Sequence, residues 1–118
     1  MTDGFIVFAH GSRIESANQG VRDLAAEFAH TAGGVPVEPA FLELGEPDLA
    51  GAVARLTTRG IRRIVVIPYF LTLGIHLERD LPQLVAAIQS ANPGIEIELR
   101  RPLEGHPALL QILLDRSK

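Results

Sequence analysis

Three of the four histidines in this 118-residue chain lie in short polar stretches that each follow an apolar or alternating run. His10 closes the run GFIVFAH, His76 lies in TLGIHLERDLP after the run IRRIVVIPYFL, and His106 follows IEIELRR. Glu43 stands near the end of a further run, VPVEPAFLEL. Two imidazoles and a carboxylate suit a divalent transition metal, and they equally suit proton transfer near neutral pH. We therefore consider His10 and His76, with a carboxylate from one of the neighbouring loops, as a candidate metal or proton-transfer site.

The spacing of these residues is not that of a metal-binding motif, because the chain has no HExxH motif and no pair of histidines four residues apart. A purely structural role for the histidines is therefore an alternative. In that alternative His10 caps a turn and His76 is a solvated loop residue. Glu43 and Glu46 could form an acid–base pair, or Glu46 could simply favour the dipole of a helix that begins at Pro47.

Gly11 and Ser12 could hold a phosphate on backbone N–H groups ahead of a helix. However, the chain contains neither GxGxxG nor GxxxxGK[ST], which disfavours a nucleotide site. It also lacks the GxSxG elbow of a serine nucleophile.

The elements that must position these residues alternate between strand and helix. Apolar or alternating stretches predict strands at residues 4–10, 35–44, 61–71 and 95–101. Helical periodicity predicts helices from Ser16 to His30, from Pro47 to before Gly60, from Pro82, and from Pro107. Four β-α units predict an α/β domain, residues 1–118, with a four-stranded parallel sheet and helices on both faces.

The strand order follows from the prolines and the β-branched residues. Pro36 and Pro39 confine the second strand to an edge, because proline cannot donate to an inner ladder. The continuous run Ile64 to Ile67 suits a central strand. The order 2-1-3-4 results, and its switch point lies between the first and third strands, where ligands of such sheets bind. We expect His10 and His76 to flank that point together.

Composition limits the class of protein. The net charge of −3 and the pI near 5.7 do not suit nucleic-acid binding. The absence of cysteine excludes disulfides and thiolate metal ligands. We see no signal peptide and no membrane span, so we expect a cytoplasmic protein. His30 is expected to stabilise the end of a helix, and His106 to be either a helix N-cap or a lining residue.

Several motifs resemble those of one family, in order and over nearly the whole chain. VFAHGSR, FLELGEPDL, VVIPYFLTLGIHLERDLP and PLEGHPALLQILLDR are similar to stretches of the short CbiX-type sirohydrochlorin cobaltochelatases, which are class II chelatases. The resemblance implies ATP-independent insertion of a divalent metal into sirohydrochlorin, with Co²⁺ as the metal or alternatively Fe²⁺ or Ni²⁺, and no further cofactor. It also implies catalytic roles for His10, His76 and Glu43, metal binding by both histidines, and a homodimer that forms the pocket by association.

The position of other residues predicts contacts with the carboxylates of such a substrate. Arg13, Arg79 and Arg101 stand at or near the predicted carboxyl edge and suit charge-assisted hydrogen bonds. Ser12, beside His10, is a further candidate substrate-binding residue. Two other functions stay open: a non-enzymatic metal or tetrapyrrole carrier, and a small anion-binding regulatory domain.

Overall fold

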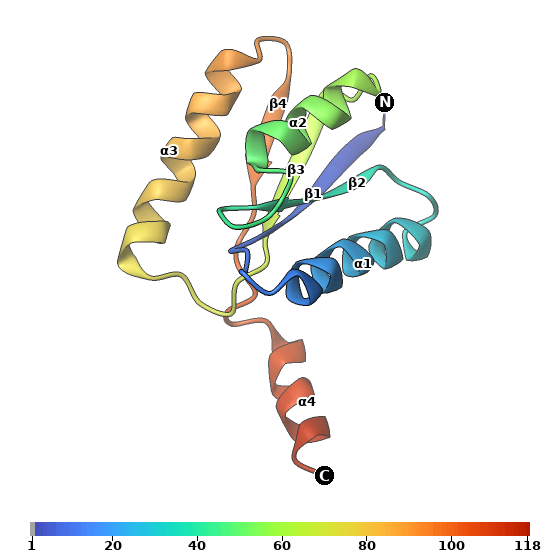
Figure 1. The fold of residues 1–118 in the computed structure, drawn as a ribbon, viewed down its shortest axis with the longest axis vertical. Coiled ribbons are helices and arrows are strands. Elements are labelled where there is room, and N and C mark those ends of the chain that lie inside the picture. The colour runs from blue at the N-terminus through green and yellow to red at the C-terminus, as the bar shows by residue number, and fades with distance from the viewer. Residues whose placement is uncertain (1) are drawn as a thin grey trace.

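In the computed structural model, which describes residues 2–118, strand and helix alternate four times along the chain (Figure 1). The elements are β1 (Asp3–Ala9), α1 (Glu15–Thr31), β2 (Val37–Phe41), α2 (Leu49–Thr58), β3 (Arg63–Pro68), α3 (Ile75–Ala91), β4 (Glu96–Leu99) and α4 (Pro107–Arg116). All neighbouring strands are parallel, and their order is β2-β1-β3-β4. The predicted fold class and strand order are therefore confirmed.

The positions of the central strands and of the edge strand in the sheet agree with those predicted from the β-branched residues and the prolines. Val7 of β1 pairs with Ile67 of β3 on one side and with Pro39 of β2 on the other. Pro39 is tolerated because β2 has a neighbour on one side only. β2 is shorter than the predicted strand, so Glu43 lies in the loop that follows it.

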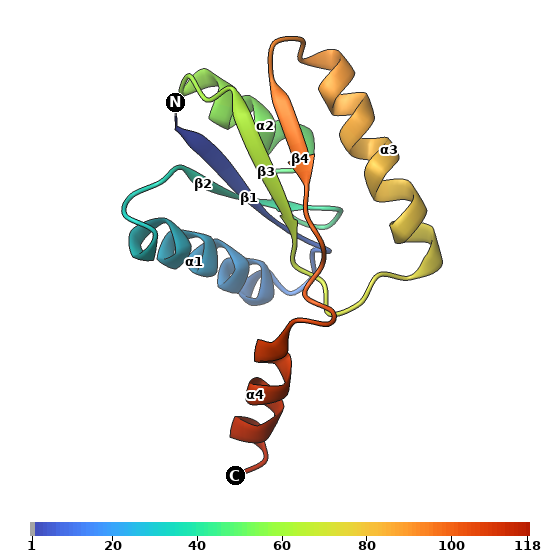
Figure 2. The ribbon, with the colours of Figure 1, turned by 180° about the vertical axis from the view of Figure 1, so that it is seen from behind.

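Helices lie against both faces of the sheet. Ile6, Phe8 and Val66 belong to the main core cluster, which also contains Leu56 of α2 and Leu81 of α3. Successive strand residues point to opposite faces. Phe5, next to Ile6, therefore points the other way, and its ring lies 5.5 Å from that of Phe28 on α1. The sheet is thus covered by α2 and α3 on one face and by α1 on the other (Figure 2).

Two predicted helix starts are wrong. Pro47 lies outside α2, because the Asp48 side chain caps the helix by accepting a hydrogen bond from the backbone N–H of Gly51 at 2.8 Å. α3 begins at Ile75, and Pro82 lies inside it. Pro82 has no N–H to donate to the carbonyl oxygen one turn earlier, yet α3 runs through this exposed position from Ile75 to Ala91. His76 is therefore on the first turn of a helix and not in a loop.

The last helix begins as predicted but does not cover the sheet. His106 is the N-cap, its Nδ1 accepting a hydrogen bond from the backbone N–H of Ala108 at 3.0 Å, and Pro107 follows at the first helical position. The N-cap prediction for His106 is confirmed. α4 projects away from the rest of the molecule and has no buried residue (Figure 1). No helix within residues 2–118 is long and apolar enough to cross a membrane.

Candidate functional site at the carboxyl edge of the sheet

His10 and Glu43 lie next to each other where β1 and β2 end. The Nδ1 atom of His10 is 3.8 Å from Oε1 of Glu43. The backbone N–H of Glu43 also donates a hydrogen bond of 3.0 Å to the carbonyl oxygen of His10, which joins the two loops just beyond the paired part of β1 and β2. The side chains are 54% and 57% exposed. An imidazole and a carboxylate are thus paired and open to solvent, an arrangement that can hold a cation or pass a proton.

Gly11 allows this close approach. Its φ of +95° is in the left-handed region, and a Cβ atom there would lie 1.6 Å from the carbonyl oxygen of Glu43. Any other residue would push the two loops apart. On its other side the ring of His10 meets the ring of Phe70 edge to face, with 6.4 Å between the centroids.

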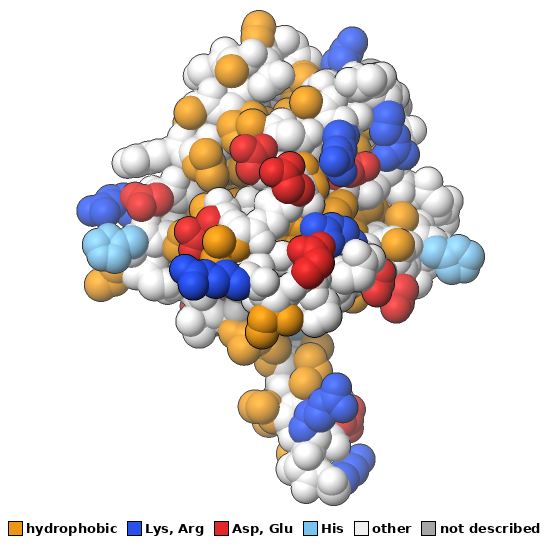
Figure 3. Space-filling view, viewed as in Figure 1, with side chains coloured by type: hydrophobic (Ala, Val, Ile, Leu, Met, Phe, Trp, Pro, Cys, Tyr) orange, Lys and Arg blue, Asp and Glu red, His pale blue; other side chains and the backbone are white. Residues whose placement is uncertain are grey.

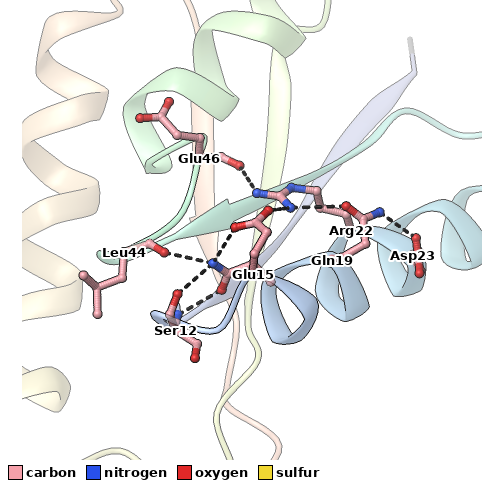
Figure 4. A network of polar contacts seen from close by, with 8 residues as sticks. Ser12, Glu15, Gln19, Arg22, Asp23, Leu44 and Glu46 are labelled. Carbon is pink, nitrogen blue, oxygen red and sulfur yellow. Dashed lines mark hydrogen bonds and ion pairs between the residues drawn. The ribbon is translucent and has the colours of Figure 1, made fainter.

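A buried asparagine is hydrogen-bonded to the same two loops, at Ser12 and Leu44, both labelled in Figure 4. Asn18, on α1, is 1% exposed. Its Oδ1 accepts a hydrogen bond of 2.9 Å from the backbone N–H of Ser12. Its Nδ2 donates to the carbonyl oxygens of Ser12 at 2.8 Å and Leu44 at 2.9 Å. Asn18 therefore joins the loop that follows His10 to the loop that follows Glu43.

Our sequence reasoning did not select Asn18, although the sequence carries a signal for it. The apolar stripe of α1 includes Val21, Ala25 and Phe28, and Asn18 falls on the same stripe, one turn earlier. A polar residue on a buried stripe needs partners for its amide. That requirement marks Asn18 as structurally important.

An exposed ion pair between Glu15 and Arg22 lies next to Asn18, which donates a hydrogen bond to Glu15. Arg22 pairs with Glu15 and also donates to the carbonyl oxygen of Glu46 at 3.2 Å, while its guanidinium lies 5.3 Å from the centre of the Phe41 ring (Figure 4). The hydrogen bond from Arg22, followed by that from Asn18, lowers the pKa of Glu15 below its ordinary value of 4.5.

This lowered pKa predicts a pH dependence of stability. A carboxyl whose pKa is lower in the folded state stabilises that state above its unfolded pKa, and the stabilisation is lost as the pH falls through the folded pKa. We expect Glu15→Gln to remove this loss. Urea unfolding at pH 7 and at acidic pH should therefore show a smaller pH-dependent decrease in stability for Glu15→Gln than for the parent. Equal decreases would contradict the prediction, and Glu27→Gln, on the same helix, is the matched control.

His76 is held in a separate contact on α3. Its Nδ1 is 3.2 Å from Nη2 of Arg79, and Nε of Arg79 is 3.3 Å from Oδ1 of Asp80. Among residues 2–118 no three His, Cys, Asp or Glu side chains form a group that could hold a metal ion. The pairing of His10 with Glu43 is in place, whereas joint action of His10 and His76 stays a prediction.

The contact with Arg79 restricts which tautomer a neutral His76 ring can adopt. Arginine only donates hydrogen bonds, so Nδ1 of His76 must be an acceptor, and a neutral ring then carries its proton on Nε2. A neutral imidazole that binds metal through one nitrogen carries its proton on the other. Metal binding by a neutral His76 is therefore incompatible with this hydrogen bond from Arg79.

Of the other predicted substrate-binding residues, Ser12 makes a hydrogen bond within the protein, whereas Arg13 and Arg101 are exposed. The hydroxyl oxygen of Ser12 accepts a hydrogen bond of 3.0 Å from the backbone N–H of Ile14. Arg13 and Arg101 are exposed. Arg101 lines an open hollow of about 560 Å³ that also includes Arg100 and His106.

The carboxyl edge also exposes large apolar side chains. Exposed fractions reach 67% for Leu71 and 81% for Ile75. Three further residues from the loops and helix starts of this edge share that exposure: Ile14, Leu44 and Tyr69. An edge with apolar side chains, arginines and a His–Glu pair suits a large, mostly apolar ligand with anionic groups.

Comparison with known proteins places the whole chain in one group. The CbiX family model matches residues 4–118. A chloroplastic sirohydrochlorin ferrochelatase of Arabidopsis thaliana is 36% identical over 97% of this chain and 51% of its own length. A sirohydrochlorin cobaltochelatase of Methanopyrus kandleri is 28% identical over 96% of this chain and 93% of its own length. The chain thus spans about half of the plant relative and nearly all of the archaeal one.

Solved structures agree with this grouping. The crystal structure of a putative cobalamin biosynthesis CbiX protein from Marinobacter aquaeolei has a TM-score of 0.85 and 28% identity, and the match covers 98% of this chain and 93% of that one. The sirohydrochlorin chelatase SirB from Bacillus subtilis subspecies spizizenii, in complex with cobalt, has a TM-score of 0.84 and 26% identity over 99% of this chain and 50% of its own.

Proposed function

Because the chain belongs to the CbiX family of sirohydrochlorin chelatases, we propose that it inserts a divalent metal into sirohydrochlorin in the cytoplasm without ATP. Cobalt is the proposed metal, with iron or nickel as alternatives, since the relatives include both a ferrochelatase and cobaltochelatases. The observation that carries the proposal is the exposed pair of His10 and Glu43 at the end of β1.

The reaction requires a metal ligand and a proton acceptor. Two N–H bonds of the macrocycle break and two protons leave, the divalent ion becomes bound to the four ring nitrogens, and it is released from its ligands on the protein. His10 and His76 are proposed to bind the incoming ion, since neutral imidazoles suit cobalt, iron and nickel alike. Glu43, 3.8 Å from His10, is proposed to accept a proton directly or to stabilise the imidazolium after His10 accepts one.

The rest of the edge supports binding of the substrate. Exposed apolar residues such as Leu71 and Ile75 offer surface for the ring. Arg13, Arg79 and Arg101 offer cations for its carboxylates, and Ser12 lies beside His10. A single edge is open on one side, so we propose a homodimer in which two such edges enclose the macrocycle.

An insertion assay tests the function. Purified protein, sirohydrochlorin and one metal at a time are mixed without ATP, and metallation is followed by the change in the absorption spectrum. We expect several turnovers per chain with Co²⁺, and comparison with Fe²⁺ and Ni²⁺ ranks the metals. Binding of metal or tetrapyrrole at a stoichiometric level, with no turnover for any of the three ions, would refute the enzyme and favour a carrier.

A further inference from the structure

Leu44, the residue after Glu43, has a strained backbone. Its φ of 58° lies in the left-handed region, and every other residue with a positive φ within residues 2–118 is a glycine. In that region the Cβ atom of an L-amino acid lies too close to its own backbone, so glycine is favoured and asparagine is tolerated. A leucine therefore disfavours the backbone conformation that this loop adopts.

The side chain of Leu44 does not offset this strain by packing in the core. Leu42, two residues earlier, packs against the main core cluster, whereas Leu44 is 51% exposed. Figure 4 shows the Leu44 side chain pointing away from α1, on the opposite side of the backbone from its carbonyl oxygen. The leucine thus contributes little to the stability of the free chain.

Neighbouring contacts hold the loop in this conformation. The carbonyl oxygen of Leu44 accepts the hydrogen bond of 2.9 Å from Nδ2 of the buried Asn18. A Cβ atom on Gly45 would lie 2.7 Å from Cγ of Phe41, so the residue after Leu44 already packs closely on that ring. Strained residues persist only where their surroundings impose the strain, and they are concentrated at binding and catalytic sites. The strain at Leu44 therefore needs an explanation outside the packing of the free chain.

We propose that Leu44 contacts the apolar ring of the bound tetrapyrrole, an inference that rests on the proposed function. Adjacent Cα atoms are about 3.8 Å apart, so a macrocycle whose nitrogens face His10 and Glu43 extends over the side chain of the next residue. The exposed side chain of Leu44 then loses its contact with water only when the substrate is bound. The strain is present with and without substrate, whereas this stabilisation belongs to the complex alone.

Exposure alone does not distinguish Leu44. Apolar side chains are exposed at many places on the face that Figure 3 shows, both on the α/β domain and along α4. Single exposed apolar residues are normal on protein surfaces. Leu71 and Ile75, on the same edge, are more exposed than Leu44, but neither has a positive φ. The combination of exposure with an unfavourable backbone is the basis of the proposal.

Thermal unfolding without ligand tests the strain. Leu44→Gly and Leu44→Ala both remove the leucine side chain, and they differ from each other only in the Cβ atom. Because a Cβ atom is unfavourable in the left-handed region, Leu44→Gly should have the higher Tm, by about 2–6 °C. At Leu71, which is exposed and has no positive φ, the alanine variant should be the more stable one. A Tm of Leu44→Gly equal to or below that of Leu44→Ala would overturn the proposal.

Binding of metal-free sirohydrochlorin tests the contact with the ring. The dissociation constant is measured from the fluorescence of the tetrapyrrole with no metal present, so that no insertion occurs. Leu44→Ala should weaken binding by about 5–30-fold, because the apolar area buried against the ring is lost. Leu44→Asn, which suits the left-handed region but is polar, should weaken it at least as much. Leu44→Met keeps an apolar side chain of similar volume and should bind within about threefold of the parent.

The failure of this contact and the failure of the proposed function give different results. A parent protein that binds and metallates sirohydrochlorin, with equally tight binding by Leu44→Ala, would overturn the contact and leave the function intact. A parent protein that does not bind sirohydrochlorin would refute both, whatever the order of stabilities at Leu44. Circular dichroism and light scattering of Leu44→Ala should match the parent. A change in mass would assign Leu44 to a contact between copies of the chain and would also overturn the proposal.

Discussion

Replacement of His10 by alanine is expected to slow metal insertion into sirohydrochlorin by about 10²–10⁴-fold, the usual effect of losing a group that transfers protons. His10 is the residue that Glu43 and Gly11 hold at the end of β1, so the variant removes the imidazole and leaves its carboxylate neighbour in place. The folded state should be little affected, because the side chain is 54% exposed. The measurement is the initial rate of the spectral change under saturating Co²⁺.

Two further variants show whether the loss of rate is specific to the His10–Glu43 pair. His30→Ala changes a histidine on the last turn of α1, at the opposite end of that helix from the His10 loop, and should leave the rate unchanged. Glu43→Gln should slow the reaction less than His10→Ala if Glu43 stabilises the imidazolium, and at least as much if Glu43 is itself the base. Full activity of both His10→Ala and His76→Ala would contradict the proposed roles.

The strand order could be predicted because local chemistry determines it, whereas Glu43 was selected from the family resemblance. Pro39 is compatible with an edge strand only, and the run from Ile64 to Ile67 needs cover on both faces. With the order fixed, the ends of β1 and β2 must be adjacent, which is consistent with the closeness of His10 and Glu43 in the structure. The position of His76 was less predictable, because a proline is a probable but not a necessary first residue of a helix. Gly74, whose backbone carbonyl accepts from Glu78, is a weaker signal of the true start of α3.

Two features depend on contacts between residues far apart in the chain, and periodicity alone could not predict them. Three of the hydrogen bonds of Asn18 are with backbone groups, one of them 26 residues away, and residue types do not show which backbone groups will be near. The leucines of α4 predict an apolar face but not what covers it. In both cases the sequence does not show the path of a loop. That path is set by hydrogen bonds between backbone groups, and these groups are the same in every sequence.

Asn18→Asp is expected to destabilise the protein by about 3 kcal/mol, since it leaves two carbonyl oxygens without a donor in a buried place. An aspartate has nearly the shape of asparagine, and it can still accept from the backbone N–H of Ser12. It cannot donate to the carbonyl oxygens of Ser12 and Leu44, and its charge lies beside both. The measurement is the free energy of unfolding in urea at pH 7. Gln19→Ala, at the next, exposed position of the same helix, is the control and should change that energy by less than about 0.5 kcal/mol.

The pH dependence of this variant separates the hydrogen-bond explanation from simple loss of packing. Protonation of the new carboxyl removes its charge and restores one O–H donor, so the stability difference between Asn18→Asp and the parent should shrink as the pH falls. Asn18→Leu adds no titratable group, so its destabilisation should vary with pH only through the lost hydrogen bond to Glu15, and therefore less than that of Asn18→Asp. A constant difference for Asn18→Asp would contradict the assigned hydrogen bonds. If the assignment is correct, the rate of metal insertion by folded Asn18→Asp should also be reduced, because Asn18 holds the loops that bring His10 and Glu43 together.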